Sequence, residues 1–253
     1  MLTLLDAFSV EAPVWSAEEL AARCELPVSS CYRYLKSLHQ AGLLARVGSG
    51  SYVVGPRVLV LDRVARMFDP VYTVGSPKVA ALSQQTRFSA LLSVLYSESV
   101  MCVRQVLAPD APAGLSGRGQ QRPLVAGATA NVILAYLPRH QLSRVFKRHH
   151  ERIAEVGLGR DWDEMRGTLA DIRAQGWCLS LGECGTGIAG LAAPLFNKDG
   201  EVLGSIGLAT AMDSPRLEEL KALVPEILEA AAEISQGIAA SSSLVDLPAR
   251  GLG

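Results

Sequence analysis

The chain has 253 residues, of which 49% are hydrophobic and 19% are charged; this composition excludes a disordered protein and fits one large domain or two modest ones. No apolar run approaches the roughly 20 residues that a membrane-spanning helix needs, and the five cysteines show no CxxC spacing, so neither a zinc site nor a disulfide framework is expected. We therefore expect a cytoplasmic protein with reduced thiols and without signal peptide, membrane contact, metal or cofactor.

The first predicted elements are short helices. Residues 2–9 carry a helical pattern, and residues 11–15 connect them to a helix pair between Ser16 and Gln40. Ser16 is a good N-cap for the first helix of the pair, and Leu26-Pro27 separates the two, because proline disfavours helical geometry in the preceding residue. The second helix has an apolar face of Val28, Cys31, Leu35 and Leu38. Its other face carries groups that can bond phosphates and base edges in a DNA major groove: Ser29, Ser30, Tyr32, Arg33, Lys36 and Ser37.

Two short strand patterns follow, over residues 43–47 and 51–54, with Gly48-Ser49-Gly50 as the turn. A hairpin directly after a helix-turn-helix is typical of a wing, which would lay Arg46 and the turn against the DNA backbone. The segment 26–61 has no acidic residue and four basic ones, in a chain whose net charge is −1. Such a local concentration of positive charge favours binding to DNA. Two amphipathic helices occur in many globular proteins, and a winged helix that serves only protein contacts is an alternative; the acid-free segment argues against it.

Gly55-Pro56 ends the hairpin and begins another helix, which Asp69-Pro70 stops. Its apolar residues share one face: Val58, Leu61, Val64, Ala65 and Phe68. We expect a DNA-binding domain over residues 1–55 and a linker helix over 56–69 that can pair with its copy in a dimer.

From residue 70 onward the pattern changes to an α+β domain that extends to residue 240. Helical patterns cover residues 71–85, 127–137, 139–150, 161–175 and 215–240, and strand patterns cover 89–108, 177–181, 188–196 and 201–210. They predict a central antiparallel sheet with flanking helices. Residues 109–122 form a long loop, and the tail 241–253 is expected to be disordered. This arrangement suits a sensor domain with a ligand between sheet and loops.

Four segments in this order resemble the IclR family of bacterial transcriptional regulators. They are LAARCELPVSSCYRYLKSLHQAGLLAR (20–46), SYVVGPRVLVL (51–61), RPLVAGATANVILAYLP (122–138) and DIRAQGWCLSLGECGTGIAGLAAPLFNKDGEVLGSIGLA (171–209). The resemblance implies a winged helix-turn-helix, a linker helix and a GAF-like effector domain. It further implies a homodimer or dimer of dimers on a palindromic DNA operator, and a small-molecule effector such as an organic or aromatic acid.

Carried over by position, the resemblance assigns two groups of residues. The DNA contacts would be Ser29, Ser30, Tyr32, Arg33, Lys36, Arg46 and Ser49. The effector contacts would be Ala128, Thr129, Ser180, Ile188, Gly190 and Gly207. The family commonly has His and a Gly-Lys pair where this chain has Val125 and Ala130-Asn131. Ala128, Gly190 and Gly207 are also small where polar contacts are usual. Either the pocket takes a larger or more apolar ligand, or the site is weak or absent.

Other motifs predict different chemistry less well. The run 185–190 matches G-x-G-x-x-G, but it leads into a strand pattern where a dinucleotide site needs a helix. Residues 114–118 lack the second glycine of a nucleophile elbow, so we do not expect an enzyme. Cys184 in the glycine turn leaves redox sensing open as an alternative. Arg118 and Arg122 either neutralise an acidic effector at the entrance of the site or are ordinary loop charges.

Overall fold

The computed structural model describes residues 1–48, 50–183 and 187–241. The chain forms two compact units, with the boundary between Phe68 and Asp69, and each unit has its own hydrophobic core. Among the described residues, no helix is both long and apolar enough to cross a membrane.

The first unit is a set of short helices followed by a hairpin. Its elements are the 3-10 helix η1 (Leu2–Ala7), α1 (Ala17–Arg23), α2 (Val28–Gln40), β1 (Leu44–Val47), β2 (Ser51–Val54) and α3 (Arg57–Phe68). Ser16 and Glu19 form a capping box at the start of α1, in which each side chain accepts a hydrogen bond from the other's backbone N–H, at 2.8 and 3.2 Å. One core joins η1, α1, α2 and the hairpin through Leu4, Leu20, Ala21, Cys31, Leu35, Leu38, Leu44 and Tyr52.

The hairpin is held to the helices at both ends. Tyr52 on β2 is buried and exchanges two backbone hydrogen bonds with Trp15, at 2.7 and 3.1 Å. At the other end the Gly55 N–H donates to the Leu43 carbonyl at 2.7 Å. A Cβ at Gly55 would collide with the Gly42 carbonyl, so only glycine fits where α2, the hairpin and α3 meet. The hairpin is therefore attached to the helical part of the unit at both ends.

Helix α3 contains no buried residue. The predicted apolar face is formed, but its side chains are exposed, and the neighbouring Leu59 is exposed to 73%. No core covers this face among the residues that the structure describes.

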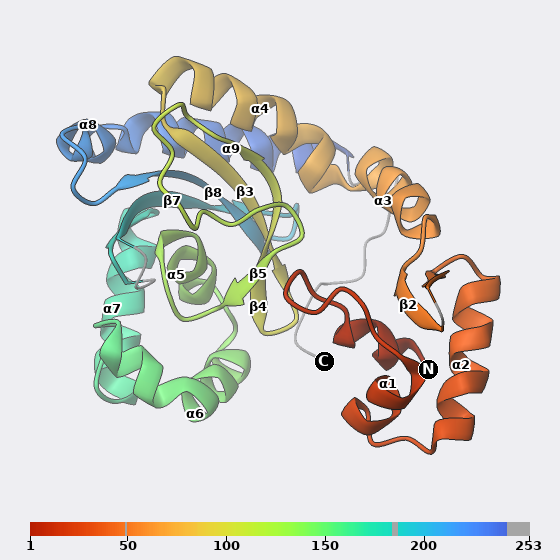
Figure 1. Ribbon diagram of the computed structural model, residues 1–253. Coiled ribbons are helices and arrows are strands. Elements are labelled where there is room, and N and C mark those ends of the chain that lie inside the picture. The colour runs from red at the N-terminus through yellow and green to blue at the C-terminus, as the bar shows by residue number, and fades with distance from the viewer. Residues whose placement is uncertain (49, 184–186, 242–253) are drawn as a thin grey trace. The chain divides into compact units, whose positions relative to one another are not determined.

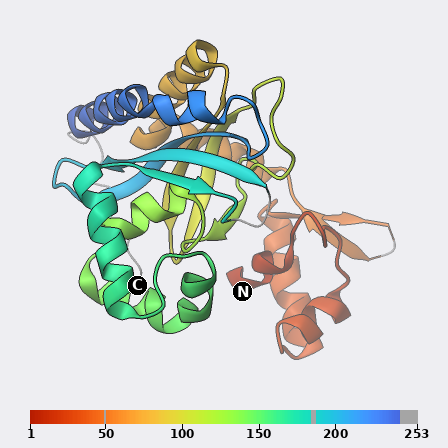
Figure 2. The ribbon, with the colours of Figure 1, turned by 90° about the vertical axis from the view of Figure 1, so that its left-hand side faces the viewer.

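The second unit is built in three layers around a six-stranded antiparallel sheet (Figures 1 and 2). Its strands are β3 (Ser89–Tyr96), β4 (Ser99–Val106), β5 (Gln121–Pro123), β6 (Cys178–Leu181), β7 (Ile188–Phe196) and β8 (Val202–Ala211). Their spatial order is β5-β4-β3-β8-β7-β6. The hairpins β3–β4 and β7–β8 are joined through the pairing of β3 with β8, in which Ala90 lies opposite Leu208.

Helices cover both faces of this sheet. On one face α4 (Pro70–Thr86) and α9 (Val224–Ser241) lie side by side, with the short α8 (Leu217–Ala222) at one end (Figure 1). On the other face α5 (Ala128–Ala135) packs on β7 and β8, with α6 (Arg139–Glu155) and α7 (Trp162–Gln175) beyond it. Strand β7 is apolar along most of its length because its two faces belong to two different cores.

The structure differs from the predicted elements at four places. Residues 2–9 form a 3-10 helix that ends at Ala7, and the end of the predicted loop 109–122 pairs as β5. The predicted helix 139–150 continues to Glu155 past a kink at His149. The predicted helix 215–240 is two helices, because Pro225 lacks an N–H and is tolerated only in a first helical turn. The tail 242–253 lies outside the described residues.

Candidate functional site

Helix α2 presents a polar and basic face opposite its buried residues. Ser29, Tyr32, Arg33 and Lys36 are exposed, and Ser30 is half-buried. The opposite side is fixed in the core by Cys31, Leu35 and Leu38, which are at most 1% exposed. The prediction was wrong for Val28, which is 46% exposed. The buried positions of α2 begin one turn later, so Val28 adds an apolar group at the start of the exposed face.

Two residues of this face have contacts inside the first unit. The Tyr32 hydroxyl donates to Glu18 Oε1 at 2.8 Å, and this hydrogen bond raises the pKa of Tyr32. The phenol thus links α2 to α1, while its ring stays exposed. The Arg33 guanidinium lies 5.5 Å from the centroid of the Tyr34 ring. Neither Arg33 nor Lys36 forms an ion pair within the described residues, so both charges are available to phosphates.

Arg46 holds a fixed place on the wing. Its Nη2 donates to the Tyr52 hydroxyl at 3.2 Å, and its guanidinium lies 5.6 Å from the centroid of that ring. The side chain is still exposed. The other predicted wing residue, Ser49, lies outside the described residues.

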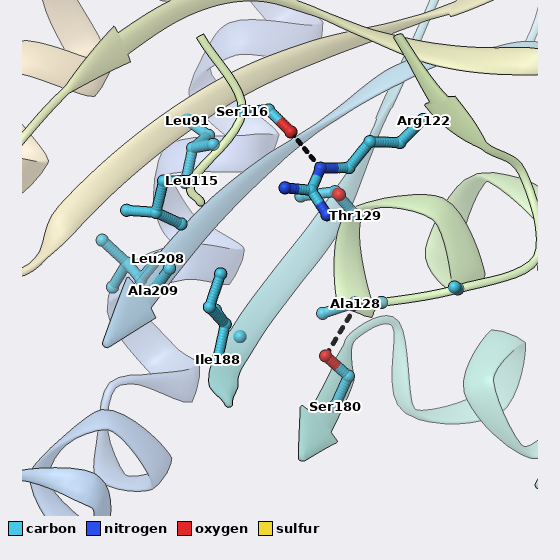
Figure 3. Close-up of a pocket in the computed structure, with 13 residues that line it drawn as sticks. Leu91, Leu115, Ser116, Arg122, Ala128, Thr129, Ser180, Ile188, Leu208 and Ala209 are labelled. Atoms are coloured by element: carbon cyan, nitrogen blue, oxygen red, sulfur yellow. Dashed lines mark hydrogen bonds between the residues drawn. The ribbon is translucent and has the colours of Figure 1, made fainter. Parts of the chain in front are cut away.

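A pocket lies in the second unit, where β3, β7 and β8 meet the start of α5 (Figure 3). Its cavity volume is about 60 Å³, and one ordered water needs roughly 10–15 Å³ of such volume, so roughly four to six waters fit. The lining comes from seven segments and comprises Leu91, Leu115, Ser116, Arg122, Ala126, Gly127, Ala128, Thr129, Ser180, Ile188, Gly190, Leu208 and Ala209.

The structure brings five of the six predicted effector residues into this lining. Ala128 and Thr129 begin α5, Ser180 lies on β6, and Ile188 and Gly190 lie on β7. Gly207 is not part of the lining: it lies behind the Thr129 methyl group, which a Cβ at position 207 would meet. No sequence pattern pointed to Leu91, Leu115, Leu208 or Ala209, which also line the pocket.

The polar groups of the pocket gather around Arg122 and the start of α5. Arg122 Nε donates to the Ser116 hydroxyl, and its Nη2 donates to the Gly114 carbonyl. The Ser180 hydroxyl accepts from the Ala128 N–H at 3.0 Å. Figure 3 shows the guanidinium and Ser180 on one side of the pocket and Leu91, Leu115 and Leu208 on the other. The arrangement suits a ligand with one polar end and one apolar end.

A carboxylate lies beside the start of α5. Glu183 Oε2 accepts from the Asn131 amide at 2.8 Å and from the Gly127 N–H at 3.2 Å. Burial raises the pKa of Glu183, and the two hydrogen bonds act in the opposite direction. Asn131 Oδ1 is buried and has no partner among the described residues. The sequence alone did not predict this cluster, because its members are about fifty positions apart.

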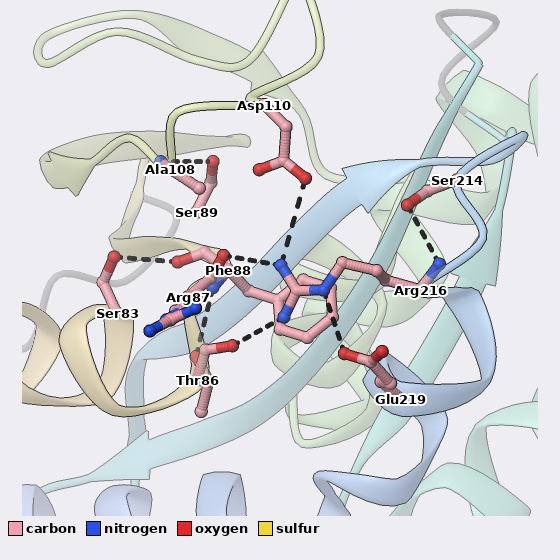
Figure 4. A network of polar contacts seen from close by, with 10 residues as sticks. All are labelled: Ser83, Thr86, Arg87, Phe88, Ser89, Ala108, Asp110, Ser214, Arg216 and Glu219. Atoms are coloured by element: carbon pink, nitrogen blue, oxygen red, sulfur yellow. Dashed lines mark hydrogen bonds and ion pairs between the residues drawn. The ribbon is translucent and has the colours of Figure 1, made fainter.

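Arg216 anchors the loop that covers the pocket (Figure 4). It donates to the carbonyls of Thr86 and Arg87 at 2.8 and 2.9 Å, and it stacks 4.0 Å from the centroid of the Phe88 ring. It also forms an ion pair with Asp110 at 3.9 Å. These contacts join the end of α4 to the loop that carries Leu115 and Ser116. Arg216 therefore holds the first part of this loop, at Asp110, against the end of α4.

The remaining candidate chemistry has little support. Burial raises the pKa of Cys102 to about 11 and that of Cys178 to about 12, so both are neutral thiols near pH 7. Cys184 lies outside the described residues. The G-x-G-x-x-G run ends in strand β7, as predicted, and not in a helix. Within residues 1–48, 50–183 and 187–241, no group of His, Cys, Asp and Glu side chains could hold a metal ion.

Comparison with known proteins shows relatives over nearly the whole chain. It is 25% identical over 240 residues to the HTH-type transcriptional regulator KipR of Bacillus subtilis, which covers 94% of each chain. It is 21% identical to the Pca regulon regulatory protein of Pseudomonas putida, covering 91% of this chain and 79% of that protein.

Solved structures agree in fold. A putative IclR regulator from Silicibacter sp. TM1040 has a TM-score of 0.80 at 21% identity and covers 98% of this chain and 96% of its own. An IclR homologue from Microbacterium hydrocarbonoxydans, complexed with 4-hydroxybenzoate, has a TM-score of 0.76 at 22% identity, with coverages of 94% and 97%. Residues 1–48 match the IclR helix-turn-helix domain, and residues 68–236 match the bacterial transcriptional regulator IclR C-terminal domain. The chain therefore belongs to the IclR family of bacterial transcriptional regulators.

Proposed function

We propose that this chain is a cytoplasmic, sequence-specific DNA-binding regulator whose operator binding is modulated by a small organic or aromatic acid. The proposal rests on one observation, which is that a basic helix face beside a wing and a ligand pocket occur in the same chain. The first unit has a basic α2 face beside a fixed wing, and the second unit has a pocket with one polar and one apolar side. The domains proposed are residues 1–55 for DNA binding, 56–69 for the linker and 70–240 for the effector.

DNA reading is assigned to the exposed face of α2 in the major groove. Arg33 is the side chain best suited to read a base edge, since an arginine fork matches guanine O6 and N7. Lys36 and Arg46 are suited to phosphates, which fix the position of the protein on the duplex without reading sequence. Val28, exposed at the start of α2, can contact a thymine methyl group.

The exposed apolar face of α3 supports a homodimer on a palindromic operator. Val58, Leu61, Val64 and Phe68 are exposed to between 38% and 62%, and an apolar helix face of this extent favours a helix partner. Pairing of two copies would bring two α2 helices to successive major grooves about one DNA turn apart. A dimer of dimers is compatible with the same pairing.

The effector class is supported by the pocket and by one relative. The homologue from Microbacterium hydrocarbonoxydans is complexed with 4-hydroxybenzoate, in which a carboxylate and a hydroxyl group lie at opposite ends of an aromatic ring. The pocket of this chain has one polar and one apolar side, which favours an acid with a single polar end, and its size suits a small acid. For the effector to act on DNA binding, it must bind the DNA-competent and the incompetent arrangements with different affinity.

Selection of bound fragments from the DNA of the source organism tests the proposal. We expect enrichment of one palindromic site, and weaker binding of that site by Arg33→Ala, by about 1–3 kcal/mol if Arg33 reads a base. Random DNA of equal length is the control for Arg33→Ala. An equal loss on both DNAs would reduce Arg33 to a phosphate contact. A folded protein that enriches no sequence, with and without candidate acids, would contradict the proposed function.

A further inference from the structure

We propose that Arg122 is the anion-holding residue of the pocket and restricts its ligands to compact monocarboxylates with an apolar body. This inference rests on the proposed function, since it concerns the same pocket. It goes further by naming the residue that recognises the charge, at a position that the family resemblance did not assign.

The charge of the pocket is concentrated in one side chain. Of the described lining residues, Arg122 alone carries a formal charge. Three positions for which the resemblance implied polar contacts are Ala128, Gly190 and Gly207, and they offer no side-chain donor. An anion in this pocket therefore has one charged partner, and that partner projects from strand β5.

The Arg122 guanidinium is already oriented. Nε donates to the Ser116 hydroxyl and Nη2 donates to the Gly114 carbonyl. Nη1 has no partner among the described residues. Figure 3 shows the guanidinium pointing into the space between Leu115, Leu208 and the start of α5. Because two of its three nitrogens are fixed by the covering loop, a ligand that accepts from Nη1 meets a group that loses little conformational freedom on binding.

A second donor lies at the start of α5. The Gly127 N–H donates to Glu183 and the Ala128 N–H donates to Ser180. The Thr129 N–H, in the same first turn, has no partner among the described residues, and Thr129 lines the pocket beside the guanidinium (Figure 3). A carboxylate between Nη1 and this N–H would receive one hydrogen bond on each oxygen, at the end of the helix dipole that favours anions.

The rest of the pocket limits the ligand to one charge. Leu91, Leu115, Ile188 and Leu208 offer only apolar surface, so a second carboxylate would be buried without a partner, which is costly. The cavity of about 60 Å³ suits the ring or short chain of a small acid and not a nucleotide.

The test compares an acid with its uncharged isostere on the full-length protein. Isothermal titration with benzoate and benzamide, and with butyrate, phenylacetate and phthalate, measures the requirement for one carboxylate. We expect a monocarboxylate to bind roughly 10- to 100-fold more tightly than its amide, as a charged hydrogen bond predicts, and phthalate to bind more weakly than benzoate.

Variants identify the residue. Arg122→Gln should lower the affinity for the acid by a similar factor and leave the amide unchanged, and Arg122→Lys should retain part of the preference. The matched control is Arg118→Gln: Arg118 lies in the loop just before β5, donates to the Val103 carbonyl and does not line the pocket. The comparison of acid with amide uses the unmodified protein. It therefore tests the requirement for a carboxylate even if the variants do not fold.

The inference is overturned if the amide binds as tightly as the acid, if Arg122→Gln keeps the preference, or if none of the monocarboxylates binds. Operator binding is measured in the same samples. If the unmodified protein shows no acid preference, or Arg122→Gln keeps it, while operator binding is intact, the assignment of Arg122 is refuted and the proposed function stands. Acid binding that depends on Arg122, without binding to any operator, refutes the proposed function and leaves the assignment in place.

Discussion

Replacement of Lys36 by alanine should change the salt dependence of DNA binding in a calculable way. Lys36 is exposed on α2 and has no ion pair within the described residues. Alanine is a better helix former than lysine, so α2 itself should not lose stability. The substitution thus removes one cation from the proposed DNA face of each copy and little else.

The size of the effect follows from a count of charges. Lys36 and Arg46 are the proposed phosphate contacts of each copy, so a dimer would neutralise about four phosphates. The logarithm of the binding constant should then fall with the logarithm of salt concentration with a slope of about −3.6, and doubling the salt should weaken binding about 12-fold. Lys36→Ala leaves about two contacts and a slope of about −1.8, so doubling the salt costs about 3.5-fold.

Fluorescence anisotropy with the selected operator, between about 50 and 200 mM salt, measures both slopes. Lys198→Ala is the matched control, because it removes the same charge from an exposed turn of the second unit. An unchanged slope in Lys36→Ala, or an equal change in Lys198→Ala, would refute the assignment of α2 to DNA.

Three further predictions concern stability and the pocket. Leu35→Ala removes a fully buried side chain from the core of the first unit and should lower its stability by about 2–5 kcal/mol, seen by thermal denaturation, with DNA binding lost and acid binding retained. Gly190→Val should weaken acid binding, because position 190 lines the pocket and the valine methyl groups would occupy its space; a Cβ there makes only ordinary contacts with Ala128 and Ser180, so the smaller Gly190→Ala should keep the melting temperature. Burial raises the pKa of Glu183 above 4.5, so its ionised form costs folding free energy above that raised pKa, and the cost disappears as the pH falls below 4.5. Glu183→Gln should therefore gain stability relative to wild type at neutral pH and lose this gain on acidification, as denaturant titrations would show.

Each of these three predictions has a control variant whose result can contradict the prediction. Val10 is 92% exposed, so Val10→Ala should not affect stability, and an equal loss in both variants would contradict the core assignment. Gly190→Ala should weaken acid binding less than Gly190→Val; an inverted order would place the ligand elsewhere. Glu229→Gln changes an exposed carboxylate, and the same pH dependence there would show that the effect does not come from Glu183.

The helical period predicted the faces of α2 because Cys31, Leu35 and Leu38 repeat at offsets of four and three. The same period placed Val28 in the core, and this was wrong. A repeat defines a direction around a helix, but it does not say how far along the axis the partner elements reach. For α3 the predicted apolar face is present, but the sequence could not show that none of its residues is buried within the part of the unit that the structure describes.

Only part of the pocket could be predicted from the sequence. Ala128, Ser180 and Gly190 were assigned by family resemblance, and the sheet brings them together through pairings such as Ser180 with Gly190. The contacts of Glu183 with the start of α5, and of Arg216 with the end of α4, link residues far apart in the sequence. No local pattern records such contacts, because they arise only once the sheet has closed.

The pairing of β3 with β8 has a consequence for how the molecule is made. Partners such as Ala90 and Leu208 are more than a hundred residues apart in the sequence, so the centre of the sheet cannot close until the ribosome has released most of the chain. The first unit needs only residues up to Phe68, and domains generally fold as units, N-terminal first, during synthesis. Contacts this distant also close slowly once both strands exist. Each nascent chain should thus complete its proposed DNA-binding unit well before the domain that would respond to the effector.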